Sequence, residues 1–177
     1  MLYYITGGER SGKSKYAQDL AVQLSDTPYY LATSRVWDED HRQRIDCHIA
    51  DRDSRWISIE EEKELSKVIQ DNSVVVIDCV TLWLTNFFVD TKNDVQKSLS
   101  LAKAEFDKLL KIDATILIIS NEIGMGVHAT TEAGRKFTEL QGWMNQYIAK
   151  HADKAVLMVS GIPVEIKGPE VLLKKQI

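Results

Sequence analysis

Short apolar runs alternate along this chain with longer segments in which apolar residues recur every three or four positions. The runs at residues 74–77 and 115–120 are continuous and rich in Val and Ile, which is typical of strands buried on both faces of a parallel sheet. Further strands are expected over residues 2–6, 29–33, 56–59 and 155–159, with an edge strand over 164–167. Strands that alternate with helices predict an α/β fold, a mostly parallel sheet with helices on both faces.

The segments between these runs have the three- and four-residue periodicity of helices that bury one face. Helices are expected over residues 13–25, 38–50, 60–70, 82–88 and 131–151, and another ends near Lys111. In the helix expected over 60–70, Leu65, Val68 and Ile69 point inward. A turn is expected over residues 160–163. Because the chain shows no linker or internal repeat, we expect residues 1–177 to form a single domain, with a loosely ordered tail over 168–177.

A glycine-rich stretch, residues 7–14, separates the first expected strand from the first expected helix. Its pattern is G-x-x-x-x-G-K-S, in which glycines leave room for a phosphate and backbone N–H groups converge on it. The helix that starts at Lys13 adds the positive end of its dipole. Lys13 is expected to reach the β- and γ-phosphates and to act in catalysis, and Ser14 to contact Mg²⁺. The pattern predicts a nucleoside triphosphate site of the P-loop NTPase type, made by Gly7, Gly8, Glu9, Arg10, Ser11, Gly12, Lys13 and Ser14.

Composition and charge narrow the class of partner. The chain has 177 residues, of which 44% are hydrophobic and 27% charged, and its formal net charge is −4. Without a general positive charge it is not expected to bind nucleic acid or an anionic membrane surface. No apolar run approaches the roughly 18 residues of a membrane span. Small-molecule substrates held by local groups are therefore expected.

The cysteines and the amino terminus bear on the compartment. Cys47 and Cys79 lack the spacing of a metal or redox motif, so both are expected to be free thiols in a reducing compartment. Because the sequence begins with an expected core strand, we expect no signal or transit peptide. These features favour the cytoplasm.

Polar residues follow several of the expected strands. In an open parallel sheet, ligands bind beyond the carboxyl ends of the strands, where Thr33, Ser34, Asp78 and Glu122 are expected to join the glycine-rich loop. Asp78 is expected to hold Mg²⁺, directly or through water; the alternative is an aspartate that only forms a turn. Glu122 is expected either to position a substrate hydroxyl or metal-bound water or to cap the turn, and the sequence leaves both open. Glu60 is also included among the candidate nucleotide-binding residues.

His48 is the candidate nucleophile. It lies four residues from both Arg44 and Arg52, so a helix through this segment places all three on one face. Guanidinium groups suit bidentate phosphate binding, and a neutral imidazole between them is able to attack phosphorus. The alternative is a solvated helix whose ion pairs contribute little. His128 and His151 are expected to be structural, and His41 has fewer cations beside it.

Taken together, several stretches resemble the bifunctional adenosylcobinamide kinase / adenosylcobinamide-phosphate guanylyltransferase family of cobalamin biosynthesis. They span nearly the whole chain in order. The Asn-Glu-Ile-Gly-Met-Gly segment and the Arg-Ile-x-x-His segment are the most particular to that family. The stretches are residues 6–14, 32–34, 44–56, 78–86, 120–126 and 159–163. Two departures from the family pattern are Cys47 beside His48, where two histidines are common, and Asp78, where a glutamate also occurs.

The resemblance implies two reactions and a role for His48. In the first, ATP or GTP phosphorylates the hydroxyl of adenosylcobinamide. In the second, His48 takes GMP from GTP and passes it to adenosylcobinamide phosphate, which yields adenosylcobinamide-GDP. The resemblance also implies a homo-oligomer, favoured as a trimer. The alternatives are a monofunctional P-loop small-molecule kinase with a structural His48, and a nucleotide-switched binding protein.

Overall fold

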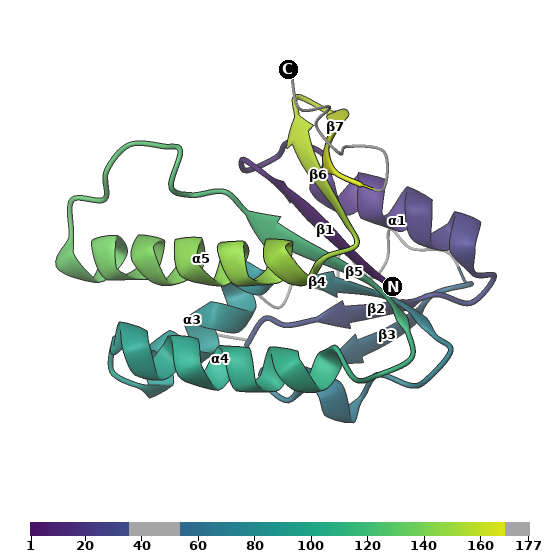
Figure 1. The fold of residues 1–177 in the computed structure, drawn as a ribbon, viewed down its shortest axis with the longest axis horizontal. Coiled ribbons are helices and arrows are strands. Elements are labelled where there is room, and N and C mark those ends of the chain that lie inside the picture. Colours follow the sequence, from purple (N-terminus) through teal and green to yellow (C-terminus); the bar gives the residue numbers. More distant parts are fainter. Residues whose placement is uncertain (36–53, 169–177) are drawn as a thin grey trace, which may run out of the picture.

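The computed structural model describes residues 1–35 and 54–168, and these form one seven-stranded sheet covered by helices (Figure 1). The strand order is β3-β2-β4-β5-β1-β6-β7. The strands are β1 (Leu2–Gly7), β2 (Tyr29–Ala32), β3 (Ile57–Glu60), β4 (Val74–Asp78), β5 (Thr115–Asn121), β6 (Lys154–Val159) and β7 (Ile162–Lys167). The helices are α1 (Lys13–Leu24), the single 3₁₀ turn η1 (Leu65–Lys67), α3 (Val80–Asp90), α4 (Val95–Leu109) and α5 (Glu132–His151).

Every neighbouring pair of strands is parallel except β6 and β7, which form an antiparallel hairpin. The hairpin turn is confined to Ser160 and Gly161, both of which have positive φ angles, 51° and 86°. The expected turn over 160–163 was therefore too long, because Ile162 and Pro163 already pair with β6. Pro163 is tolerated there since β7 is an edge strand.

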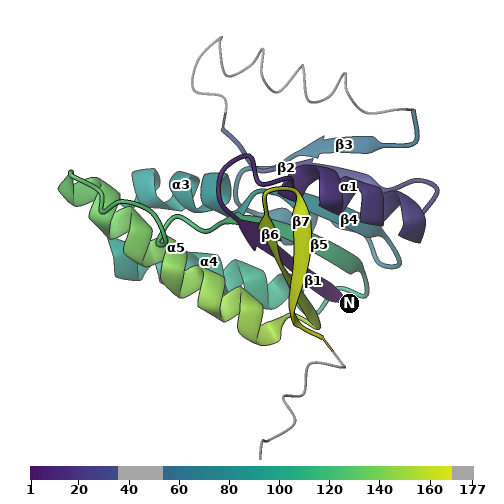
Figure 2. The ribbon, with the colours of Figure 1, turned by 90° about the horizontal axis from the view of Figure 1, so that it is seen from above.

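Alternate residues of the central strands face opposite layers of the fold. In β5, Ile116 and Ile118 belong to the core beneath α3, α4 and α5, whereas Leu117 and Ile119 belong to the core beneath α1. Figure 2 shows α1 on one side of the sheet and α4 and α5 on the other. The expected α/β architecture, a mostly parallel sheet with helices on both faces, is confirmed.

The helix expected over residues 60–70 is wrong, because only the turn η1 forms there. Side chains from elsewhere take the backbone groups that the helix needs. Asn86 Nδ2 donates to the Glu62 carbonyl at 2.9 Å, and Trp83 Nε1 to the Lys63 carbonyl at 3.1 Å. The Ser66 N–H, which a helix would direct to Glu62, donates instead to Glu105 Oε1 at 2.8 Å. The inward positions still hold: Leu65 is fully buried, and Val68 and Ile69 pack against the core.

The other expected elements within the described residues are present, with boundaries that shift by a few residues. The helix expected over 82–88 is longer, since α3 begins at Val80, directly after Asp78 and Cys79. The expected helix over 38–50 and all of the expected tail except Gly168 lie outside the described residues.

Candidate functional site

The carboxyl ends of the parallel strands bring most of the predicted site residues to one edge of the sheet. Gly7 lies opposite Asn121, so the start of the glycine-rich loop is beside Glu122. Ala32 lies opposite both Asp78 and Glu60, so the residues that follow β2 lie between the ends of β4 and β3. Strand register therefore assembles this edge from residues distant in sequence.

Two glycines of the loop have little space around them. A Cβ on Gly7 would lie 2.6 Å from the Met158 carbonyl oxygen and 2.7 Å from Ser11 Oγ. Gly12, the N-cap of α1, has φ 95°. A Cβ added to Gly12 would lie 3.3 Å from Gly161 Cα. The N–H of Gly161 donates to the Ser11 carbonyl at 2.9 Å. Residues of the β6–β7 hairpin therefore pack against the loop and hydrogen-bond to it.

Lys13 folds back onto the loop. Its side chain is 7% exposed, and Nζ donates to the Gly8 carbonyl at 2.5 Å. Burial lowers the pKa of the Lys13 amino group below its ordinary value. The loop carbonyl thus holds the ammonium at the position from which it is expected to turn towards a phosphate.

One oxygen of Asp78 joins three elements. Asp78 Oδ2 accepts a hydrogen bond from Ser14 Oγ of α1 at 2.9 Å and another from the Tyr30 hydroxyl of β2 at 2.7 Å. Asp78 Oδ1 has no hydrogen-bond partner among residues 1–35 and 54–168. Two hard oxygen donors, a hydroxyl and a carboxylate, therefore lie side by side at the mouth of the loop.

Thr33 stabilises the chain reversal after β4. It is fully buried, its hydroxyl donates to the Cys79 carbonyl at 2.8 Å, and the Cys79 N–H donates to the same hydroxyl at 2.9 Å. The Thr33 hydroxyl thus uses its hydrogen on the Cys79 carbonyl and one lone pair on the Cys79 N–H, and its predicted nucleotide contact stays a prediction. Cys79 is a buried free thiol whose pKa is raised to about 12 by burial, so it is protonated at neutral pH.

Glu122 adopts one of the two arrangements expected for it. Its N–H donates to the Gly7 carbonyl at 3.0 Å, and its Oε1 accepts from the Gly124 N–H at 3.3 Å. The carboxylate therefore caps the turn after β5 in this structure. The loop that follows is open, with Met125 and Val127 exposed by 80% and 97%.

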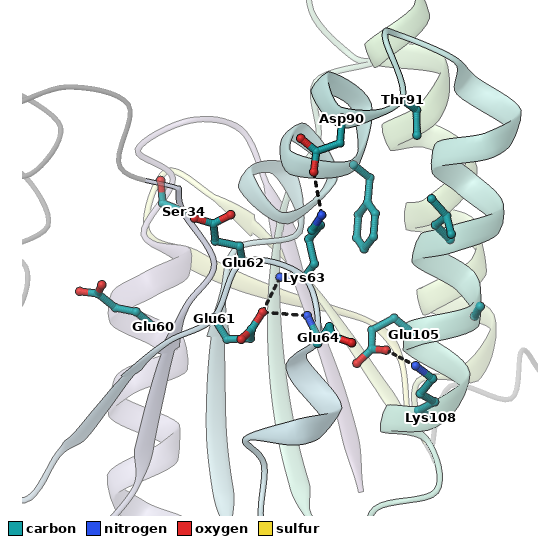
Figure 3. A pocket seen from close by; sticks show the side chains of 13 residues that line it. Ser34, Glu60, Glu61, Glu62, Lys63, Glu64, Asp90, Thr91, Glu105 and Lys108 are labelled. Carbon is teal, nitrogen blue, oxygen red and sulfur yellow. Dashed lines mark hydrogen bonds and ion pairs between the residues drawn. The ribbon is translucent and has the colours of Figure 1, made fainter.

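The remaining predicted residues fall into two groups. Glu9 and Arg10 are exposed on the loop, while Ser34 and Glu60 line a neighbouring cavity (Figure 3). The three residues of the predicted histidine face, Arg44, His48 and Arg52, lie outside the described residues, as does Cys47.

Tyr30 was not singled out from the sequence. Its side chain lies beneath α1 in the second core, 6% exposed, and reaches Asp78 because Tyr30 pairs with Val76 in the register of β2 and β4. The available signal was chemical, since a tyrosine in a buried strand usually needs a partner for its hydroxyl. That signal identifies no partner without the strand register.

Over residues 1–35 and 54–168, no three His, Cys, Asp or Glu side chains gather in a way suited to a metal ion. In the same part of the chain, none of the helices combines the length and apolar character that crossing a bilayer requires.

The chain is similar to known proteins over almost its whole length. The family model described as cobinamide kinase / cobinamide phosphate guanyltransferase matches residues 3–166. The bifunctional adenosylcobalamin biosynthesis protein CobP of Pseudomonas aeruginosa is 33% identical over 168 residues, which cover 93% of this chain and 96% of the relative. The corresponding proteins named CobU from Escherichia coli and Salmonella typhimurium are 33% and 31% identical, over 94% of this chain and 100% of each relative.

Among solved structures, the chain is similar to the flagellar accessory protein FlaH from Methanocaldococcus jannaschii. The identity is 15% and the TM-score 0.45, over 94% of this chain and 78% of that one.

Two loop glycines form a matched pair for testing the space around the loop. Gly7→Ala is expected to lower the free energy of unfolding by roughly 1–3 kcal/mol, because its Cβ meets the Met158 carbonyl and Ser11. Gly8→Ala is expected to change it by less than about 0.5 kcal/mol, since a Cβ there meets nothing within 4 Å. Urea denaturation without nucleotide measures both. Equal losses would contradict the tight packing at Gly7.

Two neighbouring tyrosines test the contact to Asp78. Tyr30→Phe removes a buried donor from Asp78 Oδ2 and is expected to lower the free energy of unfolding by about 1 kcal/mol. The control is Tyr29→Phe, which removes only an exposed 3.4 Å bond to Gln70 and is expected to cost less than about 0.5 kcal/mol. Chemical denaturation of the two variants separates them. If Tyr30→Phe is as stable as the control, the Asp78 contact does not stabilise this edge.

Proposed function

Because the chain belongs to the cobinamide kinase / cobinamide phosphate guanyltransferase family, whose members are enzymes with both activities, we propose that it catalyses two steps of cobalamin nucleotide-loop assembly. It phosphorylates adenosylcobinamide with ATP or GTP, and it then transfers GMP from GTP to give adenosylcobinamide-GDP. The observation that carries the proposal is the family match over residues 3–166, joined to a glycine-rich loop beside Asp78. The three relatives above are all named bifunctional, so nothing favours the monofunctional kinase.

The kinase step uses the loop at residues 7–14. Backbone N–H groups of the loop and the Lys13 ammonium bind the β- and γ-phosphates, and Lys13 leaves the Gly8 carbonyl to do so. The substrate hydroxyl oxygen forms a bond to the γ-phosphorus as the bond to the β-phosphate oxygen breaks. The hydroxyl proton passes to a base, and the nucleoside diphosphate leaves. Binding at the end of α1 orients the triphosphate for this attack.

A magnesium ion fits the donors at this edge. Ser14 and Asp78 offer a hydroxyl and a carboxylate oxygen 2.9 Å apart, and such hard oxygen donors, together with phosphate oxygens and water, suit Mg²⁺. When bound, Mg²⁺ neutralises charge on the phosphates. Tyr30 holds the Asp78 carboxylate in one orientation through its hydrogen bond to Oδ2, which leaves Oδ1 without a hydrogen bond from the described residues.

The guanylyl step is assigned to His48. Its imidazole nitrogen attacks the α-phosphorus of GTP, pyrophosphate leaves, and GMP is held through a P–N bond. A phosphate oxygen of adenosylcobinamide phosphate then attacks the same phosphorus and frees His48. Arg44 and Arg52 bind the phosphate charge that builds during attack. This assignment is supported by the sequence Arg44-Ile45-x-x-His48 and by the family match.

The remaining nucleotide contacts are proposed at the same edge. Arg10 and Ser34 are proposed to contact the phosphates through their side chains and Glu9 through its backbone N–H group, with Thr33 contacting the nucleotide through its backbone. Glu60 is proposed to bind ribose hydroxyls, because a carboxylate side chain repels phosphate. Glu122 is proposed to position the substrate. We further propose small-molecule partners only, a homo-oligomer favoured as a trimer, and a cytoplasmic location.

Labelling separates the two halves of the function. Wild-type protein incubated with GTP labelled at the α-phosphate is expected to retain label after denaturation, in an acid-labile, base-stable form typical of a P–N bond. His48→Ala is expected to lose the label while still phosphorylating adenosylcobinamide with ATP. Lys13→Ala is expected to lower the rates of both reactions by 100-fold or more, because the substitution removes a charge that binds phosphate. Unlabelled wild-type protein would refute the guanylyl step alone.

A further inference from the structure

A cavity of about 780 Å³ opens beside the predicted nucleotide edge (Figure 3). Its walls come from Ser34 after β2, from residues 60–64 after β3, from the far end of α3, and from one face of α4. The volume lies within the range of pockets that bind small molecules. None of its described lining residues belongs to loop 7–14, and of the nucleotide contacts proposed above only Ser34 and Glu60 also line this cavity.

The lining combines negative charge with an apolar wall. The lining holds six carboxylates and two lysines, and Arg35 and Lys67 from outside the lining pair with three of these acids, which leaves a formal excess of two negative charges. The acids are Glu60, Glu61, Glu62, Glu64, Asp90 and Glu105, and the lining bases are Lys63 and Lys108. Phe87, Leu101 and Ala104 supply apolar surface, and Leu101 is 44% exposed. A polyanionic nucleotide is disfavoured here, whereas a cation with N–H donors and an apolar body is favoured.

The charged groups around the cavity are held in place. The Arg35 guanidinium is bidentate to Asp90 at 3.0 and 3.2 Å and also donates to Glu62 at 2.7 Å. Lys63 Nζ adds a 2.7 Å bond to Asp90. These bonds, Arg35 first, hold the pKa of Asp90 well below its ordinary value, so the carboxylate stays charged near neutral pH. These four charged groups are therefore ordered and balance one another before any ligand binds, and the excess negative charge of the lining lies at Glu60 and Glu61.

The cavity lies within reach of the transferable phosphate. Ser34 follows β2 and the loop follows β1, and these strands are three spacings apart in the sheet, about 14 Å. Asn86 of α3 donates to both the Thr33 and the Glu62 carbonyls, at 2.8 and 2.9 Å, and so fixes the cavity to the end of β2. An acceptor seated in the cavity can extend a side arm along the carboxyl edge to the loop.

We propose that this cavity binds the corrinoid substrate, taking part of its amide-bearing periphery while the hydroxyl arm reaches the loop. The proposal rests on the function proposed above and identifies its second substrate site. Adenosylcobinamide is a cation whose rim carries primary amides, which donate N–H bonds to carboxylates. Its methylated ring edge packs against Leu101 and Ala104, the exposed apolar side chains of the lining.

The test fills the cavity from an exposed helix position. Ala104 lies on α4 with its side chain at the surface, so Ala104→Leu adds bulk to the cavity without overpacking the core. Ala104→Leu is expected to raise KM for adenosylcobinamide by 10-fold or more, the scale of a steric mismatch in a pocket, and to leave KM for ATP within twofold. Gln96→Leu, also exposed on α4 but outside the lining, is the matched control and is expected to match wild type.

Equilibrium dialysis of adenosylcobinamide without nucleotide gives a second readout. Ala104→Leu is expected to weaken binding by the same factor, and its melting temperature is expected to equal that of wild type. If wild-type protein phosphorylates adenosylcobinamide and Ala104→Leu keeps the wild-type KM, the cavity assignment is overturned and the proposed function stands. If wild-type protein neither binds nor phosphorylates the corrinoid, the proposed function fails first. An equal rise of KM in Gln96→Leu would also overturn the assignment.

Discussion

The carboxylate of Asp78 joins the elements that meet at the carboxyl edge of the sheet. A single oxygen accepts from Ser14 at the start of α1 and from Tyr30 in β2, while the residue itself ends β4. Hydrogen bonds to an ionised acceptor are stronger than those between neutral groups. Because the bonds join three elements that meet only in the folded protein, the loop, its helix and the neighbouring strand are fixed relative to one another.

The glycine-rich loop depends on support from the opposite end of the chain. Gly7 passes so close to Met158 that no side chain fits, and Gly12 approaches Gly161 in the β6–β7 turn. That turn has positive φ at both positions and returns a hydrogen bond to the Ser11 carbonyl. The β6–β7 hairpin therefore shapes the predicted phosphate site near the amino terminus. Its antiparallel geometry, unlike the rest of the sheet, is what allows a two-residue turn at this position.

The sequence pattern predicted strands and helices correctly where the local preference of a segment agrees with its packing in the fold. Residues 74–77 and 115–120 read as strands buried on both faces, and they form β4 and β5 at the centre of the sheet. The pattern at 60–70 failed because the competing partners, Trp83 and Asn86, lie about 20 residues away in sequence and capture the carbonyls of that segment. Periodicity indicates which side chains face inward, and it does not indicate which distant side chains hydrogen-bond to the backbone of a segment.

The candidate site also contains features that the sequence predicted and features that it did not. The proximity of the loop at 7–14 and Asp78 was predicted because this pattern has a fixed spacing and a fixed place after a strand, whereas their roles with nucleotide and metal stay predictions. Tyr30 was missed because its contact depends on the register between β2 and β4, which one sequence does not reveal. Thr33 was expected to contact nucleotide, yet its hydroxyl is bonded twice to the Cys79 backbone. The role of His48 remains a prediction supported by its arginine neighbours in sequence and by the family.

Helix α3 links the nucleotide edge to the acidic cavity. It begins directly after Asp78 and Cys79, and one face of it carries Trp83, Asn86 and Asp90, spaced so that all three point the same way. These side chains bond to the chain that leaves β2 and to the chain that leaves β3. The Oδ1 atom of Asn86 is buried and has no hydrogen-bond partner in the described part of the chain. Leaving such an acceptor unpaired costs about 1–3 kcal/mol, which the two bonds donated by Nδ2 have to offset. Phosphoryl transfer requires acceptor and donor to be held near contact distance, and small misplacements are costly. A short helix that starts beside the carboxylate proposed to hold Mg²⁺ and ends at the cavity proposed to bind the acceptor meets that requirement.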